Sequence, residues 1–144
     1  MKKIGLILSF LFAFNSFGAQ ILIPMDDSQK NHLKAYGIAF WVLENGVEIE
    51  WLLNYRGGSF MMPALESIQE NLVIKGVSFS VIAEGQANGI RSEIADPSVN
   101  QEIIKLEKAP KIAVYTPKGK QPWDDAVTMV LAYAEIPYDE IYYS

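Results

Sequence analysis

The sequence contains no cysteine and only one histidine, His32. Without cysteine this chain has no disulfide framework, thiolate metal site, cysteine nucleophile or lipid-anchored amino-terminal cysteine. His32 has no second histidine or cysteine with which to share a metal, and no G-x-S-x-G motif accompanies it, so we interpret it as a surface residue of a helix. We therefore expect no catalytic residue, no metal and no cofactor in this chain.

The sequence also lacks an apolar run long enough to cross a bilayer, which requires about 20 residues. The run that comes closest, residues 4–14, follows two lysines and precedes small residues at positions 16, 18 and 19. This order is typical of a secretory signal peptide. We predict that residues 1–19 are a signal peptide, and that the protein is periplasmic or secreted after cleavage, with no membrane span.

Positive charge is scarce, because 12 lysines and arginines stand against 17 acidic residues and give a formal net charge of −5. Loss of the two lysines in the predicted signal peptide takes this charge to −7. A net-acidic surface repels phosphate backbones, so nucleic acid is not an expected partner. Residues 20–144 suit a single domain.

Apolar runs and helical periodicity alternate along this domain. Strands are predicted at 20–25, 47–53, 77–82, 111–116 and 140–143, and helices at 29–45, 63–76, 86–95 and 123–136. The strand starts are about 27 to 34 residues apart, the length of a βαβ unit. We therefore predict an α/β fold, a flavodoxin-like, doubly wound three-layer sandwich with a mainly parallel sheet. We interpret residues 98–108 as a linker-like stretch that could hold part of a helix.

The last predicted strand, residues 140–143, has aromatic side chains and no helix after it to cover them. An uncovered apolar edge strand is an aggregation hazard. We infer that the domain is truncated at its carboxyl end, and that its partner is the remainder of a longer polypeptide.

Candidate binding residues lie in the loops that follow the predicted strands. In open α/β sheets ligands bind outside the carboxyl ends of the strands, so loops 26–28, 54–60, 84–86 and 118–123 are expected on one rim. The stretch NYRGGSF, residues 54–60, has glycines that permit positive φ and converging N–H groups, with the donors of an arginine and a serine. The same glycines also suit a plain turn. The predicted ligand-binding residues are Arg56, Gly57, Gly58, Ser59 and Trp123.

Two acidic pairs, Asp26-Asp27 and Asp124-Asp125, precede predicted helices. They would hold a hard divalent cation if their loops met. Acids in a first helical turn also stabilise the helix dipole, and we favour that interpretation.

Residues 23–60, IPMDDSQKNHLKAYGIAFWVLENGVEIEWLLNYRGGSF, and residues 106–139, LEKAPKIAVYTPKGKQPWDDAVTMVLAYAEIPYD, resemble the start of an exported bacterial family catalogued as asparagine synthetase B. Members of that family are considerably longer. The resemblance implies a first domain similar to the class I glutamine amidotransferase-like, flavodoxin-type fold.

The family's catalogue name would imply glutamine-dependent asparagine synthesis. Such an enzyme uses an amino-terminal cysteine and a serine-glycine-glycine-x-aspartate-serine loop, whereas position 2 here is Lys2 and the loop at 56–59 lacks the second half of that motif. No catalytic residue of the family carries over to this chain.

The sequence thus favours an exported, non-catalytic or degenerate amidotransferase-like binding domain for a small polar or anionic ligand. Two alternatives stay open: a hydrolase or amidotransferase whose catalytic residues lie beyond residue 144, and the asparagine synthase that the family label states.

Overall fold

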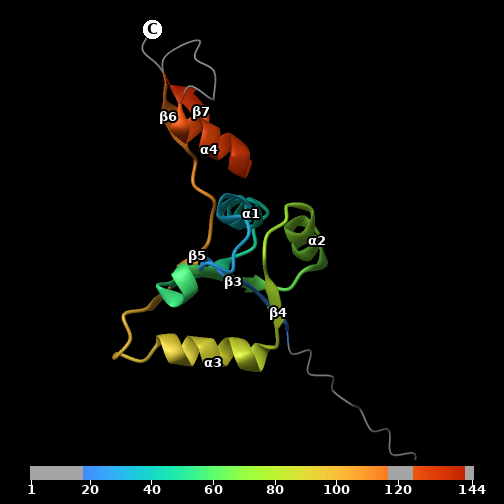
Figure 1. Ribbon diagram of the computed structural model, residues 1–144, viewed down its shortest axis with the longest axis vertical. Coiled ribbons are helices and arrows are strands. Elements are labelled where there is room, and N and C mark those ends of the chain that lie inside the picture. The colour runs from blue at the N-terminus through green and yellow to red at the C-terminus, as the bar shows by residue number, and fades with distance from the viewer. Residues whose placement is uncertain (1–17, 117–124, 142–144) are drawn as a thin grey trace, which may run out of the picture.

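The computed structural model describes residues 18–116 and 125–141. A five-stranded sheet with helices on both faces is followed by a separate β–α–β unit (Figure 1). The elements in chain order are β1 (Gln20–Ile23), α1 (His32–Glu44), β2 (Ile49–Leu53), the 3₁₀ turn η1 (Tyr55–Gly57), β3 (Ser59–Pro63), α2 (Glu66–Ile74), β4 (Ser80–Ile82), α3 (Glu84–Ile94), β5 (Glu102–Leu106), β6 (Ala113–Tyr115), α4 (Ala126–Ala134) and β7 (Asp139–Ile141).

The five-stranded sheet has the order β4-β1-β3-β2-β5, and every neighbouring pair is antiparallel. Its first four strands, with α1 and α2, follow the split βαβ arrangement that is also called ferredoxin-like. Among the described strands, only β6 and β7 pair in parallel, in a small sheet of their own. The predicted flavodoxin-like sandwich with a mainly parallel sheet is therefore wrong, although the mixed α/β class is right.

Two strands that the sequence pattern did not reveal cause this difference. Strand β3 runs back from β2 and lies between β2 and β1, so it makes every pairing in the sheet centre antiparallel. Its residues 59–62 are all buried, so they show no alternation of polar and apolar side chains. Strand β5 falls within residues 98–108, which were interpreted as a linker.

The core occupies both faces of the sheet. Helices α1 and α2 cover one face, where Ile21, Ile38 and Leu72 belong to the larger buried cluster. Helix α3 covers the other face, where Leu22 and Met61 pack in a smaller cluster (Figure 1). Neighbouring strand residues such as Ile21 and Leu22 point to opposite faces, as the pleat requires.

A buried glutamine joins the chain before α1 to the chain before β4. The Gln29 side chain donates from Nε2 to the carbonyl oxygens of Pro24, at 2.8 Å, and Ser78, at 3.1 Å. Its Oε1 accepts from the backbone N–H groups of Asn31 and Ser78. Because both ends of the amide are satisfied, Gln29 stabilises the fold and carries no free group for chemistry.

The β6–α4–β7 unit contacts the rest of the chain mainly through α4 and α1. The two helices approach so closely that a Cβ atom at Gly37 would lie 1.9 Å from the carbonyl oxygen of Ala134. Glu135, just after α4, forms ion pairs with Lys34 and Lys75. Within the described ranges, no helix has the length and apolar character needed to span a membrane.

Candidate functional site

The stretch 54–60 forms the turn that reverses the chain between β2 and β3. Arg56 (φ 46°), Gly57 (φ 81°) and Gly58 (φ 91°) all adopt positive φ values, which glycine tolerates best. The turn also lies against the end of β1, because the Met25 N–H donates to the Arg56 carbonyl at 3.0 Å. A Cβ atom at Gly57 would lie 2.4 Å from the Met25 carbonyl oxygen, so only glycine fits there.

Arg56 binds groups of its own chain. Its Nε donates to Asp26 at 2.7 Å and its Nη2 to the Ser28 hydroxyl at 3.1 Å. The hydrogen bonds from Arg56 and then Ser28 lower the pKa of Asp26 to about 2. An anion that binds this turn must therefore compete with the Asp26 carboxylate for Arg56.

Neither of the two remaining predicted binding residues is described as exposed in the turn. Ser59 is fully buried, and its hydroxyl donates to the Tyr55 carbonyl at 3.0 Å. Trp123 lies outside the described residues, as does Asp124. Asp125 accepts from the N–H groups of Val127 and Thr128 and so caps α4. Ligand binding by Arg56, Gly57, Gly58, Ser59 and Trp123 stays a prediction.

The segments that were expected together on one rim lie at two opposite ends of the sheet. Loops 26–28 and 54–60 do lie together, through Arg56 and Asp26. Residues 84–86, which were predicted to be a loop, form the first turn of α3 and lie at the opposite end, because β4 is antiparallel to β1. There Glu84 accepts a hydrogen bond from the first residue of β1, Gln20, at 2.9 Å. Loop 118–123 is outside the described residues.

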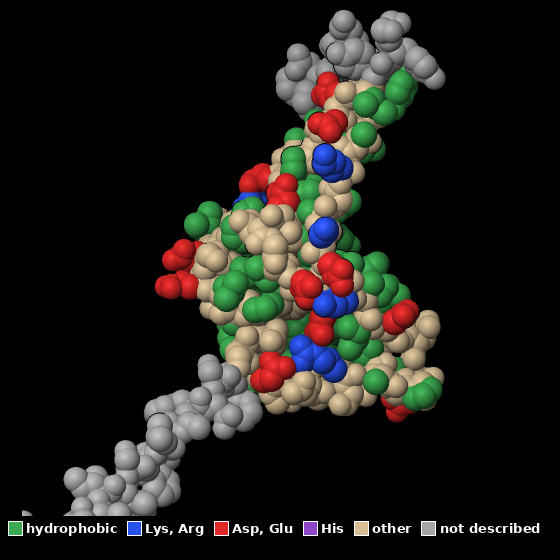
Figure 2. Space-filling view, turned by 180° about the vertical axis from the view of Figure 1, so that it is seen from behind, with side chains coloured by type: hydrophobic (Ala, Val, Ile, Leu, Met, Phe, Trp, Pro, Cys, Tyr) green, Lys and Arg blue, Asp and Glu red, His purple; other side chains and the backbone are tan. Residues whose placement is uncertain are grey.

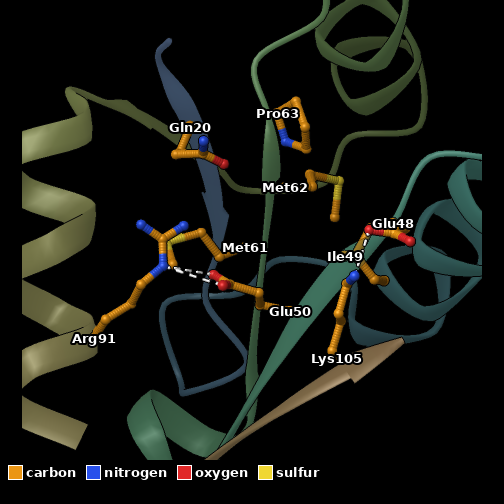
Figure 3. Close-up of a pocket in the computed structure, with 9 residues that line it drawn as sticks. All are labelled: Gln20, Glu48, Ile49, Glu50, Met61, Met62, Pro63, Arg91 and Lys105. Carbon is orange, nitrogen blue, oxygen red and sulfur yellow. Dashed lines mark hydrogen bonds and ion pairs between the residues drawn. The ribbon is translucent and has the colours of Figure 1, made fainter. Parts of the chain in front are cut away.

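This opposite end of the sheet holds a depression of about 240 Å³ (Figure 3), which we call the Arg91 depression. It is lined by residues at the start of β1 and β2, by residues at the end of β3 and β5, and by one side chain of α3. Its lining residues are Gln20, Glu48, Ile49, Glu50, Met61, Met62, Pro63, Arg91 and Lys105.

Arg91 organises one side of the depression. Its Nε donates to both Glu50 carboxylate oxygens, at 3.0 and 3.1 Å, and its Nη1 donates to Glu84 at 2.8 Å. Burial opposes the charge of Arg91, but the hydrogen bonds to Glu84 and Glu50 outweigh it, and the pKa of Arg91 lies above its ordinary value. Hydrogen bonds from Gln20 and Arg91 hold the pKa of Glu84 below its ordinary range. The guanidinium is thus held between the carboxylates of Glu50 and Glu84.

Lys105 organises the other side. Its Nζ lies 2.7 Å from Glu48, and this hydrogen bond raises the pKa of Lys105. The buried side chains of Ile49, Met61 and Met62 supply apolar surface to the depression. Figure 3 shows the Arg91–Glu50 pair on one side of the depression and the Lys105–Glu48 pair on the other, with the methionines of β3 between the two pairs.

The local sequence explains this arrangement. Along β2, Ile49 enters the core under α1, so the next residue, Glu50, points toward α3. Glu84 and Arg91 are seven residues apart, about two helical turns, and so share one face of α3. Lys105 reaches the depression from β5. The spacing of Glu84 and Arg91 was visible in the sequence, whereas Lys105 and Glu50 required the strand pairing of β2 with β5.

The side chains that line the depression can bind a ligand through ion pairs, hydrogen bonds and apolar contacts. It brings two carboxylates, two cationic side chains and one amide around buried apolar surface, and a third carboxylate, Glu84, binds Gln20 and Arg91 from outside the lining. Acidic and basic side chains also lie next to one another over the sheet and α3 on the face shown in Figure 2. In the part of the chain that the structure describes, no group of three or more histidine, cysteine, aspartate or glutamate residues is arranged to hold a metal.

Comparison of the chain with protein-family models, with curated proteins and with solved structures finds no match. The function therefore has to be inferred from the geometry of the chain itself.

Proposed function

We propose that the protein is an exported, non-catalytic binding domain for a small polar or anionic ligand, and that a polar ligand binds in the Arg91 depression. The observation that supports this most is the pair of fixed ion pairs, Arg91 with Glu50 and Lys105 with Glu48, beside buried methionine side chains. Small-molecule sites generally combine a concave apolar surface with a few well-placed polar groups.

The charges of the depression indicate the kind of ligand. The lining carries two carboxylates, Glu48 and Glu50, and two cations, Arg91 and Lys105. Each cation is already paired with a carboxylate of this chain, and Arg91 also pairs with Glu84, which does not line the depression. Because both cations are already paired, the depression favours a ligand that carries hydrogen-bond donors or a positive group in addition to any anionic group. A purely anionic ligand suits the Arg56 turn better, where it has to compete with Asp26.

The proposal that the protein is exported rests on positions 1–19, which have a basic start, a short apolar run and small residues after it. Amino-terminal sequencing of the protein from a periplasmic extract tests it. A mature start at residue 19 or 20 supports export, and an intact Met1 contradicts it. Membership of the exported family catalogued as asparagine synthetase B likewise stays a prediction from the resemblance.

A thermal-shift screen tests binding in the Arg91 depression. The probes are amino acids, sugars, polyols and small organic acids, each at several concentrations, because a ligand that binds only the folded state stabilises it with rising concentration. Lys105→Met removes the ammonium but keeps the side-chain stem, and Lys105 is 57 % exposed, so the variant should fold normally. Lys108→Met, an exposed lysine outside the depression, is the matched control.

We expect at least one polar probe to raise the Tm of the wild type in a saturable way, and Lys105→Met to weaken this effect about fivefold or more while Lys108→Met leaves it unchanged. Equal responses of the two variants would place binding elsewhere. The absence of any saturable shift across the panel would contradict the proposed function.

A further inference from the structure

A second cavity, of about 180 Å³, lies where the β6–α4–β7 unit meets the rest of the chain. We call it the junction cavity. Three separate segments enclose it: the carboxyl-terminal part of α1, the connection that precedes β6, and the loop that precedes β7. Its lining residues are Phe40, Glu44, Pro110, Lys111, Ile112, Pro137, Tyr138 and Asp139.

The walls of the junction cavity are held from both sides. The Asp139 N–H donates to the Ile112 carbonyl at 2.8 Å, which fixes the two segments from the β6–α4–β7 unit to each other. The α1 side is fixed by the contact of α4 with α1, where Tyr133 accepts a hydrogen bond from Asn31 at 2.8 Å. The size of the cavity therefore depends on how α4 sits against α1.

The carboxylates of this cavity differ from those of the Arg91 depression. Glu48 and Glu50, which line that depression, each form an ion pair. The side chains of Glu44 and Asp139, by contrast, have neither an ion pair nor a hydrogen bond with any described residue. They carry two negative charges at a cavity whose described lining residues include a single cation, Lys111, so this lining has a negative charge in excess.

The apolar part of the lining is aromatic and proline-rich. Phe40 is buried and Tyr138 is half-buried, and Pro110 and Pro137 are further lining residues. Aromatic faces attract organic cations, and they do so most strongly when carboxylates stand nearby and water is partly excluded. A calcium ion, by contrast, needs six to eight oxygen ligands, which two carboxylates on separate segments do not supply.

We propose that the junction cavity binds a small organic cation, such as a quaternary or substituted ammonium group, and that this binding holds the β6–α4–β7 unit against α1. Glu44 and Asp139 neutralise the charge, and the rings of Phe40 and Tyr138 contact the apolar substituents. The site is independent of the Arg91 depression, because the two cavities have no lining residue in common.

Choline and its neutral isostere 3,3-dimethyl-1-butanol form the pair of probes that isolates the charge. Binding of each to the purified chain is measured by isothermal titration calorimetry, and hydrogen exchange of residues 113–116 and 126–141 is followed with and without choline. Glu44→Gln removes one carboxylate charge from the cavity at an exposed position. Glu70→Gln, on α2 and outside the cavity, is the control.

We expect choline to bind in a saturable way and the neutral isostere to bind at least tenfold more weakly. Glu44→Gln should weaken choline binding about fivefold, Glu70→Gln should leave it unchanged, and choline should slow exchange in the β6–α4–β7 unit. Equal binding of the two probes, equal loss in the two variants, or no saturable binding of choline would each overturn the proposal.

Discussion

The five-stranded sheet and the β6–α4–β7 unit differ in how far each can bury its own apolar surface. The sheet has helices on both faces and a buried cluster on each. The described residues of the β6–α4–β7 unit form two strands of three residues and one helix. Their large exposed apolar side chains are Tyr115, Val127, Met129, Val130, Tyr133 and Ile141. A parallel pair covered on one face cannot close a core, so this unit depends on its contact with α1.

The contact between the two regions is small and specific. Among the described residues it includes the close approach of Gly37 to Ala134 and the ion pairs of Glu135 with Lys34 and Lys75. Tyr133 adds the hydrogen bond from Asn31 and the packing of Lys34 over its ring at 4.9 Å. The stability of the β6–α4–β7 unit should therefore respond to changes in α1, whereas the sheet should not respond to changes in α4.

The largest expected effect is loss of core packing in the sheet region. Leu72 is fully buried on α2, so Leu72→Ala should lower the free energy of unfolding by about 2 to 5 kcal/mol. Val130 on α4 is 37 % exposed, and Val130→Ala should change the free energy of unfolding by less than about 0.5 kcal/mol. Urea unfolding of both variants measures the difference. Similar losses would mean that the two regions share one core.

A glycine substitution should separate the two regions. Gly37→Ala places a methyl group where the Ala134 carbonyl lies, so α4 must move, although alanine in a helix is favoured over glycine by about 1 kcal/mol. We expect residues 126–134 to lose hydrogen-exchange protection while the sheet keeps its own. Gly89→Ala on α3, where an added Cβ meets no neighbouring atom within 4 Å, should leave exchange in α4 unchanged. Unaltered protection of α4 in Gly37→Ala would show that the helix contact tolerates the shift.

The smallest expected effect is electrostatic. Hydrogen bonds from Lys34 and then Lys75 lower the pKa of Glu135 from 4.5 to about 2. A lowered pKa means that Glu135 stabilises the folded state fully above pH 4.5 and loses this contribution as the pH falls toward 2. Glu135 is 55 % exposed, so the effect should be small and weaken with salt.

Glu135→Gln is the variant that tests this contribution. It should flatten the pH dependence of protection in α4 between about pH 4.5 and 2. Asp26, whose pKa is also about 2, remains in the variant and should keep the pH dependence of the turn at Arg56. An unchanged pH profile in α4 would show that Glu135 does not hold the unit in place.

The sequence pattern predicted the existence of most elements but not their direction. Each of the predicted strands and helices has a counterpart, from β1 to β7. The pattern missed β3 because its buried residues do not alternate and Pro63 suggested a helix start. It missed β5 because residues 98–108 follow the helix-ending Asp96-Pro97 and mix charged with apolar side chains. One unseen strand between β1 and β2 is enough to turn an expected parallel sheet into an antiparallel one.

The prediction of the binding site depended on the direction in which the strands run. In a parallel sheet all loops after strands lie at one end, but in an antiparallel sheet they alternate between the two ends. Loops 26–28 and 54–60 were therefore predicted together correctly, whereas Glu84 lies at the other end with Gln20. Arg91 and Lys105, which define the depression there, come from a helix face and from the unseen β5, so no motif in the chain marked them.

Hydrogen exchange measured by mass spectrometry on the wild-type chain tests the central claim most directly, because it reports the two regions separately. We predict that amides of β1, β3 and β2 exchange only through global unfolding, while those of β6, α4 and β7 exchange much faster through local opening. Equal protection of both regions, lost in a single cooperative step, would contradict the conclusion that the β6–α4–β7 unit depends on a small contact with α1.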